Sequence, residues 1–430
     1  MHLFNGMKNE NGVLSIGGVK LTDLHAKYKQ ALYVYDEQLI EDTCSLFTEN
    51  FKSSSFETEI LYASKAFSCL EIYRVISKFG LGADVVSQGE MFTAKQAGFD
   101  MSKTYFHGNN KTYGELDAAL EYGVRNIIID NDYEYRIIND LAKEREVQVN
   151  VLLRINTGID AHTHEYIKTA KDDSKFGYSV YDEKIFELIA DISKQSNLNF
   201  LGFHSHIGSQ IFEETSFFEA TNTVFSFAKD VQERVGTEIK VLNLGGGFGV
   251  YYTQNDKPFE LASFLQRYIK VIEKEKANSG LNIEKIIIEP GRSLICNTGS
   301  TLYEVGGTKK TYAGREYIFV DGGMGDNPRY ALYKAEYECC IANKLDEENT
   351  TEYTVAGKYC ESGDVIIKDV MLPQAERGDL LLVTSTGAYN HSMASNYNRM
   401  RKLGVVFVKD GKDRLVVKPD TLEDLLRNDI

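Results

Sequence analysis

The sequence has no long hydrophobic run. None of its apolar stretches approaches the roughly 20 residues that a membrane-spanning helix needs. Its start, Met1 to Gly6, also lacks the layout of a secretory signal peptide. We therefore expect a soluble, cytoplasmic protein with no membrane partner.

Positive charge is scarce as well. The chain carries 48 Lys and Arg against 63 Asp and Glu, which gives a formal net charge of −15. A charge of this sign repels nucleic-acid phosphates and anionic lipid surfaces at long range. We expect no nucleic-acid partner, although a local basic pocket is compatible with this balance.

Cysteine pairs with metal-site spacing are missing. The six cysteines are scattered without a C-x-x-C pair, so neither a zinc site nor a disulfide framework is indicated. Cys360 lies in a polar turn beside glycine, where a thiol can be exposed and reactive. We interpret the other five as buried or half-buried thiols: Cys44, Cys69, Cys296, Cys339 and Cys340.

An alternation of strands and helices is what the sequence does contain. Apolar strands recur about eight times with helical segments between them, which is typical of an α/β TIM (β/α)8 barrel. The last third is rich in strands separated by turns, and this favours an all-β barrel or sandwich. We predict an N-terminal segment that packs with the β domain, a barrel and a C-terminal β domain, over residues 1–32, 33–292 and 293–430.

Reactive residue types follow several of these strands. Lys65 ends an apolar strand, and His204 and His206 lie two apart on another, so both point to one face. The carboxyl ends of barrel strands share one mouth, so these groups should meet in one cavity. An isolated lysine here is more often a surface residue, but a desolvated lysine can bond an aldehyde cofactor.

Two further segments suit an anion. The Gly245 to Gly247 run can bring backbone amides close to a phosphate, although a tight turn is the simpler interpretation of glycines alone. Arg292 leaves the next strand, and barrels commonly bind phosphate with the loops after their last two strands. The planar guanidinium of arginine pairs well with phosphate oxygens.

Glu289 follows three isoleucines, where an ionised carboxylate needs a cation or a donor. A protonated pyridine nitrogen is one such partner, and a neighbouring arginine is another that is nearly as probable from this residue alone. The rival site is a metal centre, because His162-Thr163-His164 and His204-Ser205-His206 both have H-x-H spacing. We favour the cofactor, and no metal, because the Glu289-Pro290-Gly291-Arg292 segment suits an anion.

Together these motifs resemble the alanine-racemase-fold (fold type III) decarboxylases that depend on pyridoxal 5'-phosphate, and among them the diaminopimelate decarboxylases. The resemblance covers nearly the whole chain. It rests on residues 62–66, 204–210, 245–247 and 289–292, and more narrowly on residues 107–111, 160–166, 174–177, 360–364 and 387–389.

The resemblance implies a role for each matching position. Lys65 would hold the cofactor covalently, His206 would stack on its ring and Glu289 would pair with the ring nitrogen. Cys360 would be the proton donor, and it would arrive with Glu361 from the second subunit of a homodimer. The cofactor phosphate would be surrounded by Ser209, Gly246, Gly247, Gly291, Arg292 and Tyr389.

The same resemblance implies the substrate. Arg329 and Tyr333 match positions that bind a distal carboxylate, Glu361 matches one that takes a distal ammonium, and Arg292 and Tyr389 would also reach the substrate. The implied reaction converts meso-2,6-diaminopimelate to L-lysine and carbon dioxide, the last step of lysine biosynthesis. A related decarboxylase of another basic amino acid or of carboxynorspermidine, or a non-catalytic homologue, stays open.

Two stretches depart from the family pattern. Residues 399–403 stand where the family usually has a proline-containing stretch, just beyond a loop expected at the substrate and phosphate. Gln88 replaces a glycine that is common before Gly89-Glu90, and we expect it to alter only a turn.

Overall fold

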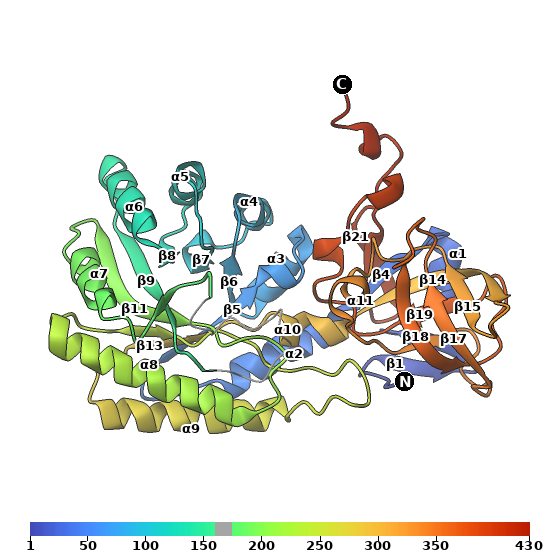
Figure 1. The fold of residues 1–430 in the computed structure, drawn as a ribbon, viewed down its shortest axis with the longest axis horizontal. Helices are drawn as coiled ribbons and strands as arrows, with labels where there is room; N and C mark the ends of the chain where they lie inside the picture. The colour runs from blue at the N-terminus through green and yellow to red at the C-terminus, as the bar shows by residue number, and fades with distance from the viewer. Residues whose placement is uncertain (160–173) are drawn as a thin grey trace. The chain divides into compact units, whose positions relative to one another are not determined.

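The structure is a computed structural model that describes residues 1–159 and 174–430. The chain divides into two compact units. We call them the barrel unit, residues 43–249 and 258–293, and the β unit, residues 1–42, 250–257 and 294–430. Figure 1 labels the helices and strands of both.

A closed ring of parallel strands forms the centre of the barrel unit. Each strand pairs with the next, and β13 pairs back with β5, which closes the ring. The ring confirms the predicted TIM barrel. Its strands are β5 (Glu57–Ala63), β6 (Gly82–Val85), β7 (Thr104–Phe106), β8 (Asn126–Ile129), β9 (Val149–Asn156), β11 (Leu198–Ser205), β12 (Val241–Asn243) and β13 (Lys285–Ile288), and the short β10 (Tyr178–Ser179) pairs with β9.

These strands are apolar because both of their faces are covered, as in other parallel sheets. All three isoleucines of β13 are fully buried, for example. Side chains from the ring strands fill the inside of the barrel, which is therefore a packed core and not a pore. This inner cluster contains Leu61, Tyr105, Ile128, Leu152, Val241 and Ile287.

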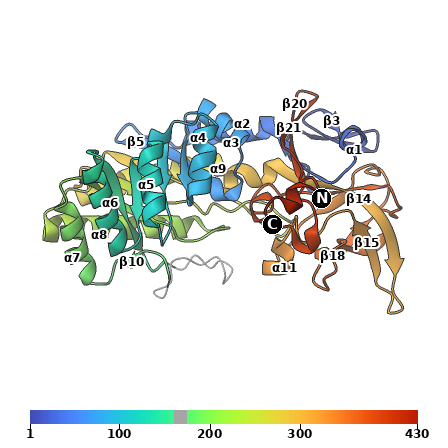
Figure 2. The same ribbon diagram turned by 90° about the horizontal axis from the view of Figure 1, so that it is seen from above.

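Helices cover the outside of the ring. Neighbouring helices α4, α5 and α6 lie side by side (Figures 1 and 2). In α5 the Thr112 side chain and Glu115 form a reciprocal capping box, and Gly123 ends the helix in a left-handed conformation with φ 97°. The helices are α2 (Glu37–Asn50, which continues from the β unit), α3 (Leu70–Lys78), α4 (Gln88–Gln96), α5 (Tyr113–Tyr122), α6 (Asp132–Glu144), α7 (Lys184–Ser193), α8 (Glu214–Val235) and α9 (Leu261–Ser279).

A mixed sheet dominates the β unit. Its main path runs β18-β17-β15-β14-β4-β20-β21, and β19 pairs with β14 and β16. This confirms a strand-rich C-terminal region. The strands are β4 (Leu32–Asp36), β14 (Gly299–Lys310), β15 (Glu316–Val320), β16 (Cys339–Ile341), β17 (Thr351–Ala356), β18 (Val365–Leu372), β19 (Leu380–Val383), β20 (Gly404–Lys409) and β21 (Lys412–Val417).

The first residues of the chain pack against this sheet. A small antiparallel sheet of β1 (Met7–Glu10), β2 (Val13–Ile16) and β3 (Val19–Lys20) is followed by α1 (Leu21–Tyr28). Leu14 and Leu24 share a buried cluster with Leu302, Leu382 and Val406. The predicted domain limits at residues 32 and 292 stay a prediction, and β4 belongs to the β unit.

No helix in the described part of the chain is both long enough and apolar enough to span a membrane.

Candidate active site

Polar side chains gather at the carboxyl ends of the barrel strands. Lys65 lies on a short 3-10 turn, Ser64–Ala66, directly after β5, and its side chain is exposed while its two neighbours are buried. The Tyr62 hydroxyl donates to the Phe67 carbonyl at 2.8 Å and ties the end of β5 to the chain beyond the turn. Lys65 is thereby presented from a fixed piece of backbone.

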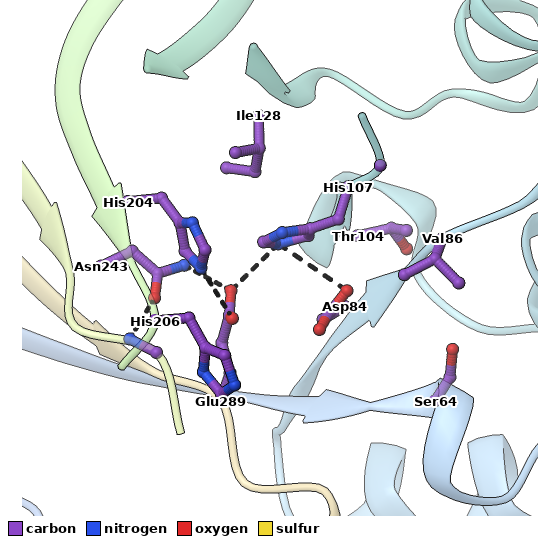
Figure 3. Close-up of polar contacts among 12 residues, drawn as sticks. Ser64, Asp84, Val86, Thr104, His107, Ile128, His204, His206, Asn243 and Glu289 are labelled. Carbon is purple, nitrogen blue, oxygen red and sulfur yellow. Dashed lines mark hydrogen bonds and ion pairs between the residues drawn. The ribbon is translucent and has the colours of Figure 1, made fainter. Parts of the chain in front are cut away.

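The strand register brings the next groups together. His204 is paired with Asn243, and Asn243 with Ile287, so the ends of β11, β12 and β13 lie level. Glu289 follows Ile287 by two residues, and Figure 3 shows its carboxylate pointing toward His204 and His107. Residues from three different strands and from the loop after β7 therefore converge at one point.

The Glu289 carboxylate is buried and surrounded by donors. The Asn243 amide donates to Oε1 at 2.6 Å, and His204 Nε2 lies 3.1 Å from Oε2. His107 Nε2 lies 3.0 Å from Oε1 and 3.7 Å from Asp84 Oδ1 (Figure 3). Imidazoles and an amide are thus the partners of the carboxylate.

Burial and pairing decide the charges in this cluster. Burial lowers the pKa of His204 to about 4, against the attraction of Glu289, so the ring is neutral at pH 7. Burial raises the pKa of Glu289, but His107 and His204 outweigh that effect and leave the pKa well below its usual range. Burial also raises the pKa of Asp84. Glu289 is therefore negatively charged and could pair with a cationic ring nitrogen.

His206 is held as a neutral, planar group. Its Nδ1 accepts from the Gly246 N–H at 3.3 Å. Burial lowers its pKa well below the usual range, and the Lys65 charge adds to that effect. Its stacking on a cofactor ring stays a prediction.

The glycine run forms a turn without room for side chains. A Cβ at Gly246 would lie 2.1 Å from the Glu289 carbonyl oxygen. One at Gly247, where φ is 109°, would lie 2.4 Å from the Gly208 carbonyl oxygen. Only glycine fits these positions, because both require close backbone approach and Gly247 also has a left-handed conformation.

A cation stands close to this turn. Arg292 is buried, and its Nε donates to Ser209 Oγ at 3.1 Å. A Cβ at Gly291 would lie 2.9 Å from the Cβ of Ala63, which places the Arg292 segment against the end of β5, next to Lys65. A glycine turn with a guanidinium and a hydroxyl fits a phosphate. The buried Glu289 carboxylate fits a pyridinium. The residues present therefore fit pyridoxal phosphate.

Several residues of this site were given no role by sequence reasoning. Asp84, His107 and Asn243 each lie at or directly after the end of an apolar strand, and that position was the available signal. Lys111 supports the loop that carries His107. Its buried ammonium donates to Glu134 at 2.9 Å and to the carbonyls of Gly108 and Ile128 at 2.7 and 2.6 Å.

The remaining predicted residues belong to the β unit. Arg329 begins the short helix α11 (Arg329–Tyr333), is buried, and donates to the hydroxyls of Tyr252 at 2.6 Å and Tyr337 at 3.2 Å. Cys360 is exposed, while the five other cysteines are buried, as predicted. Glu361, Tyr333 and Tyr389 also lie in this unit.

The structure bears on only part of the metal alternative. His162 and His164, together with the rest of the 160–166 motif, lie outside the described residues. Ligand atoms of His107, His204 and Glu289 lie within 4.8 Å of one another, so geometry alone leaves a metal open at that point.

Comparison with known proteins identifies the family and supports the cofactor. A family model described as "Pyridoxal-dependent decarboxylase, pyridoxal binding domain" matches residues 37–296. The chain is 44% identical to a diaminopimelate decarboxylase of Bacillus subtilis over 98% of this chain and 96% of that protein. It is 42% identical to the one of Halalkalibacterium halodurans, over 99% and 98%.

A solved structure agrees with these relatives. The diaminopimelate decarboxylase of M. jannaschii in complex with L-lysine superimposes with a TM-score of 0.93 at 32% identity. The match covers 99% of this chain and 98% of that chain. Fold and sequence thus point to the same family.

Proposed function

Since this chain belongs to the pyridoxal-dependent decarboxylase family, we propose that it is a diaminopimelate decarboxylase, which converts meso-2,6-diaminopimelate to L-lysine and carbon dioxide with pyridoxal phosphate as cofactor. The observation that carries the proposal is the Glu289 carboxylate, held ionised among His107, His204 and Asn243 in the same barrel mouth as the glycine turn and Arg292. Bound pyridoxal phosphate supplies an electron sink for the bonding electrons that carbon dioxide leaves behind.

The barrel residues hold and tune the cofactor. Lys65 would bind it covalently through its amine, and the neutral His206 imidazole would stack on its ring. The ionised Glu289 would hold a proton on the ring nitrogen, because a buried carboxylate stabilises an adjacent cation.

The glycine turn, Ser209 and Arg292 would bind the phosphate. Gly246, Gly247 and Gly291 would let the backbone come close to the phosphate because glycine has no side chain of its own, while the Gly246 N–H also donates to His206. Ser209 and Arg292 add a hydroxyl and a charge, and a charged donor forms the stronger hydrogen bonds. Tyr389 would complete this set.

We propose that substrate selection rests on Arg329, Tyr333 and Glu361, together with Arg292 and Tyr389. The Arg329 guanidinium is already positioned by two tyrosine hydroxyls, so a distal carboxylate meets a preorganised fork. A substrate without that carboxylate, such as ornithine, leaves the buried charge without its acceptor and is discriminated against. This favours diaminopimelate over the other basic amino acids.

We also propose a cytoplasmic homodimer in which Cys360 and Glu361 serve the site of the other subunit. The Cys360 thiol returns a proton to the carbon that has lost carbon dioxide. Its exposure supports this role, because a buried thiol could not reach a substrate.

A spectroscopic and chemical assay tests the proposal. Purified protein mixed with pyridoxal phosphate should show an absorbance band that borohydride removes and that Lys65→Ala lacks. Adding meso-diaminopimelate should then release carbon dioxide and L-lysine, while L-ornithine and carboxynorspermidine should react poorly. A cofactor that binds without any lysine appearing would point to the non-catalytic homologue, and bound zinc without the band would point to the rival metal centre.

A further inference from the structure

The loop that carries Cys360 and Glu361 is fixed at its base. This loop, residues 359–364, connects β17 to β18 and is called here the Cys360 loop. The buried Asp364 carboxylate accepts from the Tyr359 N–H at 2.8 Å and from the Met324 N–H at 2.6 Å. The first bond joins the two ends of the loop, and the second ties its end to residue 324. Cys360 and Glu361 lie at its exposed tip.

A second segment of the β unit contacts that tip. The Cys360 N–H donates to Asn398 Oδ1 at 2.8 Å, and the Tyr397 hydroxyl donates to Glu361 Oε2 at 3.4 Å. The rings of Tyr397 and Tyr359 lie parallel, with an interplanar angle of 2° and centroids 6.1 Å apart. Both tip residues therefore have a partner in the segment 396–400, called here the 396–400 turn.

The 396–400 turn adopts an unfavourable backbone. Asn398 and Arg399 are successive left-handed residues, with φ of 53° and 57°. Asparagine tolerates this conformation, but arginine is penalised in it and needs support from its surroundings. A conformation of this kind persists only where other contacts require it.

The support comes from the last residues of the sequence. The Arg399 guanidinium donates to the Leu425 carbonyl at 2.7 Å and to Asp429 at 2.6 Å. The Asn396 amide donates to the Met400 carbonyl at 2.9 Å and to Asp420 at 2.7 Å. Residues 420–429 thus brace the turn through these hydrogen bonds.

We propose that Tyr397 and Asn398 are positioning residues that set the place of Cys360 and Glu361 for the reaction, with Arg399 bracing them. Asn398 fixes the backbone at the proton donor, and Tyr397 orients the carboxylate that receives the distal ammonium. The inference rests on the proposed function for the roles of Cys360 and Glu361. It also assigns a supporting role to Arg399, which begins the stretch where the sequence departs from the family pattern.

Substitutions at Asn398 distinguish the effect of its side-chain acceptor from the effect of its left-handed backbone conformation. Asn398→Gly keeps the left-handed conformation but deletes the acceptor, and Asn398→Asp keeps an acceptor oxygen. We expect kcat to fall about 3- to 10-fold in the glycine variant, the loss expected for one hydrogen bond, and to be largely restored in the aspartate variant. Tyr397→Phe should instead raise KM for meso-diaminopimelate. Asn11→Gly is the matched control, because Asn11 is an exposed left-handed asparagine in the same unit.

Two measurements report on the loop independently of activity. Hydrogen exchange of residues 359–364 should accelerate in Asn398→Gly and not in Asn11→Gly. The rate of iodoacetamide labelling should change as well, and it reports on Cys360 because the other cysteines are buried. If wild-type protein is no decarboxylase, the proposed function fails, while these two measurements still test the loop contact. Unchanged exchange, or changed exchange with unchanged kcat and KM, would overturn the positioning role.

Discussion

At the scale of one residue, burial and pairing determine the charge of Glu289. A carboxylate this deep costs free energy unless donors surround it, and His107, His204 and Asn243 supply them. The same donors keep it ionised, and an ionised group at this point can hold a pyridinium proton. The proposed contact of Glu289 with the cofactor is therefore electrostatic.

Glu289→Gln should lower kcat about 100-fold or more, the size of effect seen when one preorganised charge-stabilising group is removed. The cofactor should still bind, because Lys65 and the phosphate turn are untouched, and the absorbance band checks this. Glu284→Gln, an exposed carboxylate just before the same strand, is the control and should leave kcat unchanged. A change of only a few-fold in Glu289→Gln would mean that the carboxylate is structural.

His204 links this cluster to pH. Burial depresses its pKa to about 4 from the ordinary value of about 6.5, so the unfolded chain binds this proton more readily than the folded one. Stability from this group is fully present above about pH 6.5 and is lost as the pH falls toward 4. Between pH 7 and pH 5 the loss should be about 2 kcal/mol.

Urea unfolding at pH 7 and pH 5 measures this loss, and His204→Gln should remove it. His391 has a similarly lowered pKa of about 4, so part of the acid destabilisation should remain in the variant. An identical pH dependence in wild type and His204→Gln would contradict the assignment.

At the scale of elements, the turn after β12 shows what a glycine run contributes. The sequence is compatible with two interpretations of it, a tight turn and a phosphate cradle. The structure shows a turn that is tight because three backbone segments meet there. Its Gly246 N–H donates to His206 Nδ1, and contact of the turn with a phosphate stays a prediction.

Gly246→Ala should weaken cofactor binding at least about 10-fold, because the new methyl group meets a carbonyl oxygen that cannot move without shifting β13. Titration of the absorbance band with pyridoxal phosphate measures the affinity. Gly114→Ala, at a helix position with open space around it, is the control and should bind as wild type. Equal affinities in both variants would show that the turn does not form the phosphate site.

At the scale of the whole molecule, the proposed homodimer makes a prediction about mixing. If Lys65 and Cys360 of one site come from different subunits, then Lys65→Ala and Cys360→Ala proteins are each inactive. Dissociated, mixed and reassociated, they should regain about a quarter of wild-type activity, because random pairing makes about half of the dimers hybrids with one intact site. Lack of any recovery, with hybrids demonstrated by mass spectrometry, would place both residues in one subunit.

The sequence by itself determined the fold class and predicted the candidate site residues. Strand and helix periods are local properties, and polar residues after apolar strands share the barrel mouth, so Lys65, His206, Glu289 and Arg292 stand out from sequence position alone. His206 accepts from the Gly246 N–H, Glu289 accepts from the Asn243 amide, and Arg292 donates to Ser209. These contacts fit the roles expected of the three residues. The strand-rich character of the C-terminal region was predictable for the same local reason.

Only the tertiary structure decided which groups touch. Whether Glu289 contacts an arginine or imidazoles depends on strand register. That register brings residues 107, 204 and 243, which are far apart in the chain, together around Glu289. The pairing of β4 with β14 and β20, and the contact of Asn398 with Cys360, likewise join distant segments. Local patterns contain no information about such contacts, because their free energy appears only once the chain has brought the partners together.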